Sequence, residues 1–257
     1  MDLIDSHCHL TFAGLREDLP GVLSRAHDAG VRRIITVGTD LADARAALET
    51  ARRHADVHLA AGIHPHEAAK VGPDDLQQLA QILRDPKAVA VGEIGLDFHY
   101  DFSDRPSQRR VFQEQLRLAA ETGLPVVIHC REALDETIAA LCAAGMEGRK
   151  VVFHCFSGDP HQAARIADHG WRVSFTGIVT FKNATQPQAV ARALPDDQLI
   201  VETDAPYLSP VPVRHQRPCA PAMLVHTVRF LADLRKQDPD ELARRCTANT
   251  TEFFNLP

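Results

Sequence analysis

The sequence predicts an α/β protein: a single-domain (β/α)8 barrel of the TIM type that spans residues 1–257, with additional helices after its last strand. Two observations predict this fold class. Short apolar runs rich in β-branched residues alternate with longer segments of helical periodicity, a pattern typical of a parallel sheet with helices on both faces. In addition, α/β barrels commonly occur as one domain at a length of 257 residues.

The predicted strands occupy residues 2–6, 32–38, 57–63, 88–94, 125–129, 150–155, 172–178 and 199–203. Most of the segments between them have helical periodicity. In 15–30, for example, apolar residues recur at i, i+3, i+4 and i+7, and Gly30 ends the helix. The segment 105–122 begins with a proline in its first turn and is followed by Gly123. Two further helices are predicted near 222–236 and 239–248.

An open, doubly wound sheet would give a similar alternation of strands and helices. Such sheets usually carry a glycine-rich phosphate loop at the first strand–helix junction. Here that junction reads His7-Cys8-His9. The sequence therefore favours the barrel over the open sheet.

Composition is that of a globular protein, with 45% hydrophobic and 24% charged residues. No apolar run approaches the roughly 20 residues that span a bilayer, and the amino terminus lacks the features of a signal peptide. We expect a cytoplasmic protein without membrane contact. The six cysteines form no C-x-x-C pair and are expected to be reduced thiols.

Charge and aromatic content narrow the possible partners. A net charge of −6 argues against a protein that coats long duplexes, because such a protein needs a basic stripe. An aromatic content of 5% argues against a platform that stacks many bases. No heptad pattern or long apolar stripe indicates assembly, so we expect a monomer.

Histidines and carboxylates gather at the ends of the predicted strands. In a barrel the carboxyl-terminal ends of the strands build the active face. The residues of this kind are His7, His9, His64, His66, Glu93, His129, His154 and Asp204. Because these residues come from six different strands, their convergence on one rim indicates a metal site more strongly than any single histidine would.

Alternation along a strand separates the cysteines from the proposed ligands. Residues i and i+2 face the same way, so His7 and His9 can grip one ion while Cys8 points away. The same reasoning separates Cys130 from His129 and Cys155 from His154. We interpret these three cysteines as small buried hydrophobic residues that do not bind the metal.

The strand ends "DSHCHL", "GIHPH", "GEIGLDF", "VIHCREA", "VFHCFSG" and "ETDAPYL" resemble, in order and spacing, those of the TatD family of metal-dependent deoxyribonucleases. The resemblance runs from residue 2 to the terminal "NTTEFFNL". It implies two divalent ions, with Glu93 bridging them. The ligands it implies are His7, His9 and Asp204 for the first ion and His129 and His154 for the second.

This resemblance implies a DNA phosphodiesterase, a deoxyribonuclease of the 3'-5' exonuclease type acting on single strands or ends. Two metals can clamp the attacking and leaving oxygens of such a reaction and activate the attacking water. Asp204 would then act as the general base, with Glu93 as the other catalytic carboxylate. Mixed imidazole and carboxylate ligands suit Zn, Mn, Fe or Co, whereas the family is usually described as Mg-dependent. We therefore expect two divalent ions: Mg, Mn or Zn.

Substrate contacts are predicted for His64, Arg131 and Ser157. Arg131 has an alternative role, since it could pair with Glu132 or Asp135. Asp97, His99 and Glu202 could orient ligands through hydrogen bonds. His66 is expected to belong to the loop that follows the predicted strand 57–63.

One segment, 213–221, departs from the family's usual glycine- and asparagine-containing turn, which leaves the substrate details there open. Two other functions also remain open: hydrolysis of an ester or amide at the same metal site, and a non-catalytic, metal-stabilised binding barrel.

Overall fold

The computed structural model describes residues 1–257. The chain divides into two compact units. Unit 1 consists of Met1–Thr36, Cys155–Arg165 and Arg172–Pro257, and unit 2 of Val37–His154 and Ile166–Trp171. That residues 1–257 form a single domain remains a prediction.

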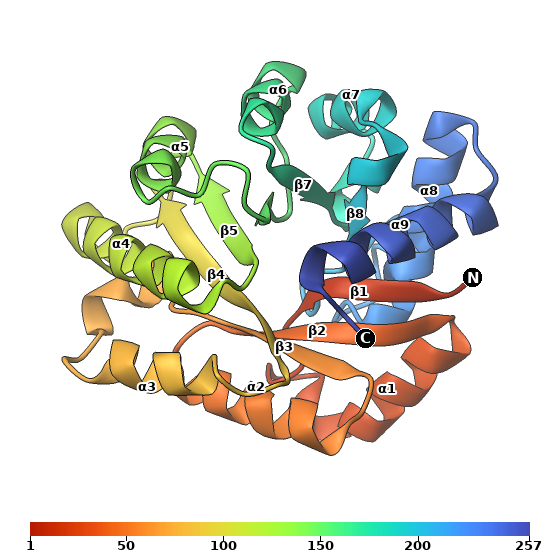
Figure 1. Cartoon of the computed structure of the whole chain (residues 1–257). Helices are drawn as coiled ribbons and strands as arrows, with labels where there is room; N and C mark the ends of the chain where they lie inside the picture. Colours follow the sequence, from red (N-terminus) through yellow and green to blue (C-terminus); the bar gives the residue numbers. More distant parts are fainter. The chain divides into compact units, whose positions relative to one another are not determined.

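Strands and helices alternate along the whole chain (Figure 1). The strands are β1 (Leu3–Cys8), β2 (Val31–Gly38), β3 (Val57–Ala61), β4 (Ala88–Asp97), β5 (Val126–Arg131), β6 (Val151–Phe153), β7 (Arg172–Phe175) and β8 (Ile200–Val201). The helices are α1 (Leu19–Asp28), α2 (Leu41–Arg53), α3 (Asp75–Ile82), α4 (Arg105–Thr122), α5 (Leu134–Ala143), α6 (Pro160–Asp168), α7 (Thr185–Ala193), α8 (Leu224–Arg235) and α9 (Pro239–Phe254).

The eight strands lie in the sheet in their sequence order. Pairing is parallel between β1 and β2 and between β7 and β8 in unit 1, and along β3, β4, β5 and β6 in unit 2. Within unit 1, β1 also lies beside the end of β8, where Cys8 and Ala205 form a parallel bridge. First and last strands are neighbours in a barrel. The (β/α)8 prediction is confirmed, including the helices after the last strand, and the open sheet is wrong.

Local sequence explains where the long helices begin and end. The Asp104 side chain accepts a hydrogen bond from the Ser107 amide at the start of α4, and Gly123 ends that helix in the left-handed conformation. Asp40 caps α2 and Asp238 caps α9 in the same way. In unit 2, α4 packs along β4, as Figure 1 shows.

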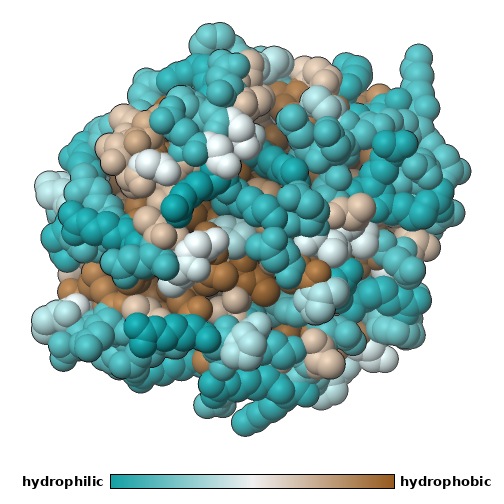
Figure 2. Space-filling model, in the orientation of Figure 1, coloured by the Kyte–Doolittle hydropathy of each residue, from teal (hydrophilic) through white to brown (hydrophobic).

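The strands are deeply buried. Every residue of β1, β3 and β4 is buried, as expected for strands covered on both faces. Trp171, Phe112 and Phe153 are among the largest fully buried side chains. Figure 2 shows hydrophilic residues over most of the visible face, with hydrophobic residues exposed mainly in its hollows.

Two of the strands that carry predicted ligands end earlier than the sequence indicated. β6 ends at Phe153 and β8 at Val201, so His154 and Asp204 lie in the turns that follow. Cys155 and Asp204 have positive φ values of 50° and 56°, which take the backbone out of the extended conformation. Cys155 therefore does not alternate with His154 as a strand residue would, and that part of the prediction is wrong.

Candidate metal centre

Unit 1 brings together three of the predicted ligands, His7, His9 and Asp204. The Nε2 atoms of His7 and His9 are 3.3 Å apart. Asp204 Oδ1 lies 3.3 Å from His9 Nε2 and 3.7 Å from His7 Nε2. The possible ligand atoms of the three residues all lie within 4.8 Å of one another. Two imidazoles and a carboxylate at this spacing fit a divalent ion.

Backbone hydrogen bonds between β1 and the turn after β8 build this ligand set. The Asp204 amide donates to the His7 carbonyl (2.9 Å), and the His9 amide donates to the Ala205 carbonyl (2.7 Å). Ring contacts with Phe12 and Tyr207, at centroid distances of 5.1 and 6.2 Å, orient the His9 imidazole. The three side chains are thus held by rigid elements.

Buried carboxylates support the same turn. Asp5 accepts hydrogen bonds from the Thr203 amide (2.9 Å) and hydroxyl (2.6 Å), while burial raises the pKa of Asp5 to about 7. Glu202 accepts from the Cys155 amide (2.7 Å) and the Ser6 hydroxyl (3.2 Å). These bonds hold Glu202 and Thr203, the two residues before Asp204, and a role of Glu202 in orienting a ligand remains a prediction.

Unit 2 holds a second set around the buried carboxylate of Glu93. Its Oε1 lies 2.7 Å from His154 Nε2, 2.8 Å from His129 Nδ1 and 3.4 Å from His64 Nε2. Burial acts to raise the pKa of Glu93, but His154 and His64 outweigh it and hold the pKa well below its usual range. Glu93 is therefore a carboxylate at neutral pH. Together with His129 and His154 it also fits a divalent ion.

A close approach of β4 to β5 brings Glu93 and His129 together. Gly95 pairs with His129, and a Cβ at Gly95 would lie 1.9 Å from the His129 carbonyl oxygen. Gly95 also has a φ of 145°, which L residues rarely adopt. Only glycine fits at this point of the strand.

His64 lies beside Glu93 as a neutral imidazole. Burial lowers the pKa of His64 to about 4. Its Nδ1 accepts a hydrogen bond from the His66 amide (3.1 Å), so the ring proton is on Nε2, the atom that faces Glu93. His64 can therefore donate from Nε2, as the predicted phosphate contact requires.

Asp97 connects two imidazoles behind the unit 2 ligands. Its Oδ2 accepts from His129 Nε2 and from His66 Nε2, both at 2.9 Å, and its Oδ1 accepts from the amides of His99 and Tyr100. Burial acts to raise the pKa of Asp97, but the hydrogen bonds from His129 and His66 lower it far below its usual range. Burial acts to lower the pKa of His129, but hydrogen bonds to Asp97 and Glu93 outweigh it and raise that pKa. Because Asp97 holds a proton on Nε2, Nδ1 is the ring atom that would give up its proton to bind an ion beside Glu93.

Sequence reasoning proposed a supporting role for Asp97 but gave no specific role to His66. The available signal was its position two residues after His64, in the same loop. It also overlooked Gln108, whose buried side chain accepts from the Asp97 amide and donates to the carbonyls of Asp97 and Ser103.

The predicted substrate residues other than His64 lie on the surface. The guanidinium of Arg131 lies 4.7 Å from the centroid of the Tyr100 ring. Glu132, one of its two predicted partners, pairs instead with His99 (2.7 Å). Ser157 is exposed in the turn before α6. The segment 213–221 is mostly exposed, and its Cys219 amide donates to the Pro206 carbonyl (2.9 Å).

All six cysteines are free thiols, as predicted. Cys8 is fully buried, and burial raises its pKa well above the usual value. Burial also raises the pKa of Cys130. Cys155 is half-buried, with its Sγ 3.4 Å from the Thr176 hydroxyl.

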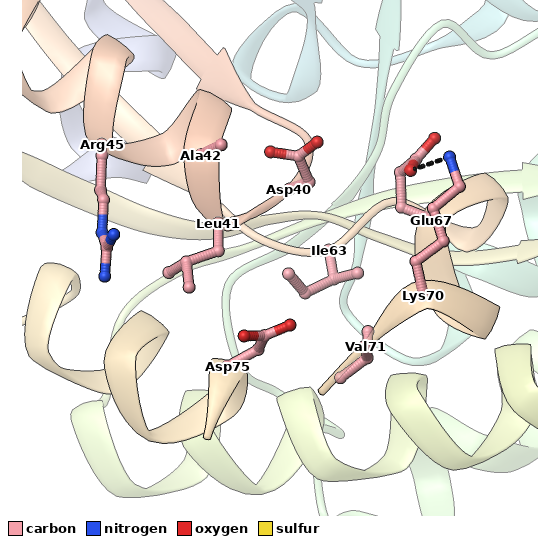
Figure 3. A pocket seen from close by; sticks show the side chains of 9 residues that line it. All are labelled: Asp40, Leu41, Ala42, Arg45, Ile63, Glu67, Lys70, Val71 and Asp75. Atoms are coloured by element: carbon pink, nitrogen blue, oxygen red, sulfur yellow. Dashed lines mark hydrogen bonds and ion pairs between the residues drawn. The ribbon is translucent and has the colours of Figure 1, made fainter. Parts of the chain in front are cut away.

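A pocket of about 280 Å³ lies in unit 2, beside the segment that follows β3 (Figure 3). Leu41, Ile63 and Val71 provide its apolar lining, and Figure 3 shows the carboxylates of Asp40 and Asp75 on either side of these residues. None of the predicted metal ligands lines this pocket. The pocket is therefore distinct from the ligand set around Glu93.

No helix of the chain has the length and apolar character needed to cross a membrane.

Comparisons with known proteins identify the family of the chain. Residues 4–255 match the model of the family described as TatD related DNase. The chain is 35% identical to YabD of Bacillus subtilis, named an uncharacterized metal-dependent hydrolase, with 99% of each chain covered. It is also 35% identical to the 3'-5' ssDNA/RNA exonuclease TatD of Erwinia tasmaniensis, over 99% of this chain and all of that one.

A solved structure supports the fold. The crystal structure of YjjV, a TatD homolog from Escherichia coli, superposes with a TM-score of 0.93 at 34% identity, covering 99% of this chain and 98% of that one. The predicted resemblance is thus confirmed over nearly the whole chain. The protein belongs to the TatD related DNase family and is a metal-dependent hydrolase with the (β/α)8 fold.

Proposed function

We propose that this hydrolase cleaves phosphodiester bonds of DNA, as a 3'-5' exonuclease, using two divalent ions. The observation that carries the proposal is the convergence of three imidazole nitrogens on one oxygen of the buried Glu93. A relative that matches over its whole length and is named a 3'-5' ssDNA/RNA exonuclease supports the choice of substrate.

One ion is assigned to each ligand set. His7, His9 and Asp204 would hold the first, and His129 and His154 the second, with Glu93 bridging as the family resemblance implies. When bound, two divalent ions lower the pKa of a coordinated water and polarise the scissile phosphodiester. We expect Mg, Mn or Zn to serve.

The protein's own groups then move protons and hold the substrate. Asp204, which is partly accessible with 14% of its side chain exposed, accepts the proton of the attacking water. His64 donates from Nε2 to a phosphate oxygen, Arg131 neutralises a phosphate, and Ser157 provides a further polar contact. A cytoplasmic location and a monomeric state complete the proposal.

End-labelled single-stranded DNA provides the test. Metal-depleted protein receives Mg, Mn or Zn, and the products are compared with those of Glu93→Gln and Asp204→Asn. We expect a ladder that shortens from the 3' end and a loss of turnover of at least about 100-fold in both variants. Glu49→Gln, which changes the same charge at an exposed site on α2, serves as the control.

Three results would contradict the proposal. Full activity in both variants would refute the assigned roles. Intact DNA with every metal, combined with cleavage of acyl esters or amides, would select ester or amide hydrolysis at the same ligands. Chelation that unfolds the protein, with no hydrolysis of any substrate, would select the metal-stabilised binding barrel.

Metal stoichiometry tests the two-ion assignment separately. Native protein should bind two equivalents of metal. His9→Asn should lose one equivalent and His154→Asn the other, because each removes a ligand from a different set. A single equivalent in the native protein would refute the dinuclear assignment.

A further inference from the structure

The loop 98–104, between β4 and α4, carries two exposed aromatic side chains. Phe102 is 65% exposed and Tyr100 is 40% exposed. Single exposed apolar residues are common on protein surfaces, whereas neighbouring ones that form a patch can mark an interaction site. Both rings lie in the loop that follows β4, the strand that carries Glu93 and Asp97. The exposed rings are therefore only a few residues away from the groups that hold the unit 2 ligands.

The two rings form one small surface. The ring centroids of Tyr100 and Phe102 are 5.4 Å apart, and their planes are inclined by 35°. His66 packs against both, with centroid distances of 4.7 Å to Phe102 and 5.6 Å to Tyr100. Since His66 also donates to Asp97, which accepts from His129, the surface is connected to the unit 2 ligands through two hydrogen bonds.

Buried polar contacts hold this loop in place. The Ser103 hydroxyl donates to the His66 carbonyl (2.7 Å) and accepts from the Ala69 amide (3.0 Å). The buried Gln108 side chain donates to the carbonyls of Asp97 and Ser103, at both ends of the loop. Rings presented on an anchored loop lose little freedom when they bind, which favours a binding role.

A positive charge lies beside the rings. The Arg131 guanidinium, at the exposed end of β5, lies 4.7 Å from the centroid of Tyr100. An aromatic surface combined with an adjacent arginine is the combination with which proteins bind unpaired nucleotides, because the ring stacks on the base and the cation contacts the phosphate.

We propose that Phe102, backed by Tyr100, stacks on one unpaired nucleobase of the substrate while Arg131 contacts the neighbouring phosphate. This inference rests on the proposed nuclease function and assigns a place on the protein surface to one unpaired base of that substrate. In a duplex both faces of a base are already stacked, so this surface cannot engage it without melting. An overall aromatic content of 5% is compatible with a surface for a single base.

The first test measures binding without cleavage. The probe is a single-stranded oligonucleotide that contains 2-aminopurine, whose fluorescence is quenched by stacking, and the protein background is Glu93→Gln. Adding Phe102→Leu, which keeps an apolar side chain but removes the ring, should raise Kd about 5- to 150-fold and abolish the quenching. Phe102→Trp should restore both. Equal Kd and equal quenching in the Leu and Trp variants would overturn the proposal.

The second test uses cleavage by the protein with native Glu93. Oligonucleotides in which one nucleotide at a time is replaced by a base-free analogue should show a rise in KM at a single position. Phe102→Leu should remove that positional effect and leave the KM for the base-free oligonucleotide unchanged. A positional effect that persists in Phe102→Leu would overturn the proposal.

The two tests separate this proposal from the proposed function. If the native protein cleaves no DNA with any metal, the nuclease proposal fails, whereas the 2-aminopurine experiment still decides the stacking role. If DNA is cleaved but Phe102→Leu behaves as native in both tests, only the stacking role fails.

Discussion

Asp97→Asn replaces one carboxylate oxygen of a fully buried side chain with an NH2 group. The oxygen accepts hydrogen bonds, whereas the NH2 group donates them. In the native protein both carboxylate oxygens accept from N–H donors. These donors are His129 and His66 on one side and the amides of His99 and Tyr100 on the other. An asparagine amide has one acceptor and one donor end, so in either orientation its NH2 group faces N–H donors. The variant cannot satisfy all four bonds.

The structure also indicates how large the effect will be. If the asparagine keeps its oxygen toward the two amides, the His129 Nε2–H loses its acceptor, and the ring can recover a bond only by moving its proton to Nδ1. A proton held on Nδ1, the ring atom 2.8 Å from Glu93, leaves that atom without the lone pair that a bound ion would need. Loss of such a supporting bond typically lowers metal affinity 10- to 100-fold, which corresponds to about 1.4–2.8 kcal/mol.

Metal affinity at each ligand set is the appropriate measurement. Chelator-competition titrations would give two dissociation constants, identified with the help of His9→Asn and His154→Asn. We expect Asp97→Asn to raise the dissociation constant of the ion whose binding depends on His154. The dissociation constant of the other ion should stay within a factor of about 2 of the native value. Asp104→Asn is the matched control, because it makes the same change nearby at a helix cap, where asparagine serves as well as aspartate.

The reasoning fails if Asp97→Asn binds both ions as tightly as Asp104→Asn. It also fails if both ions weaken equally, because a general loss of stability would explain that result without any role for the His129 tautomer.

Further predictions concern stability and metal removal. Gly95→Ala should lower the free energy of unfolding by about 3 kcal/mol or more, because its Cβ would collide with the His129 carbonyl; Gly123→Ala, which has a positive φ but open space around it, should cost about 1 kcal/mol in the same urea titration. Asp196→Asn should cost about 1–2 kcal/mol at neutral pH, because hydrogen bonds from Gln237 and Arg235 lower the pKa of this partly exposed carboxyl. A carboxyl group with a lowered pKa stabilises the fold at pH values above its ordinary pKa of 3.8, and this stabilisation is lost as the pH falls below that value. The difference in free energy of unfolding between native protein and variant should therefore shrink in urea titrations below about pH 4. Removal of metal by a chelator should abolish hydrolysis. It should also lower the free energy of unfolding by about 3 kcal/mol for each ion present at 100 times its Kd, while circular dichroism still shows a cooperative melt. Unchanged stability would contradict binding of the ions to the native ligand sets.

The sequence by itself determined the fold class and the identity of the family. Alternating strands and helices follow from local periodicity, and a histidine or carboxylate after a parallel strand is placed at a fixed edge of the sheet by covalent connectivity alone. For this reason His7, His9, Glu93, His129 and Asp204 could be proposed as metal ligands without coordinates.

Tertiary structure decided the contacts between residues far apart in the sequence. The sharing of Asp97 between His66 and His129, the proton position on His64 and the stacking of Arg131 on Tyr100 depend on side-chain directions in loops, which have no fixed period. The exposure of Phe102 was equally hidden, because a single aromatic residue in a loop has the same local pattern whether it is buried or exposed. Periodicity encodes which face of a strand or helix is buried, whereas loop side chains are placed by the packing that surrounds them.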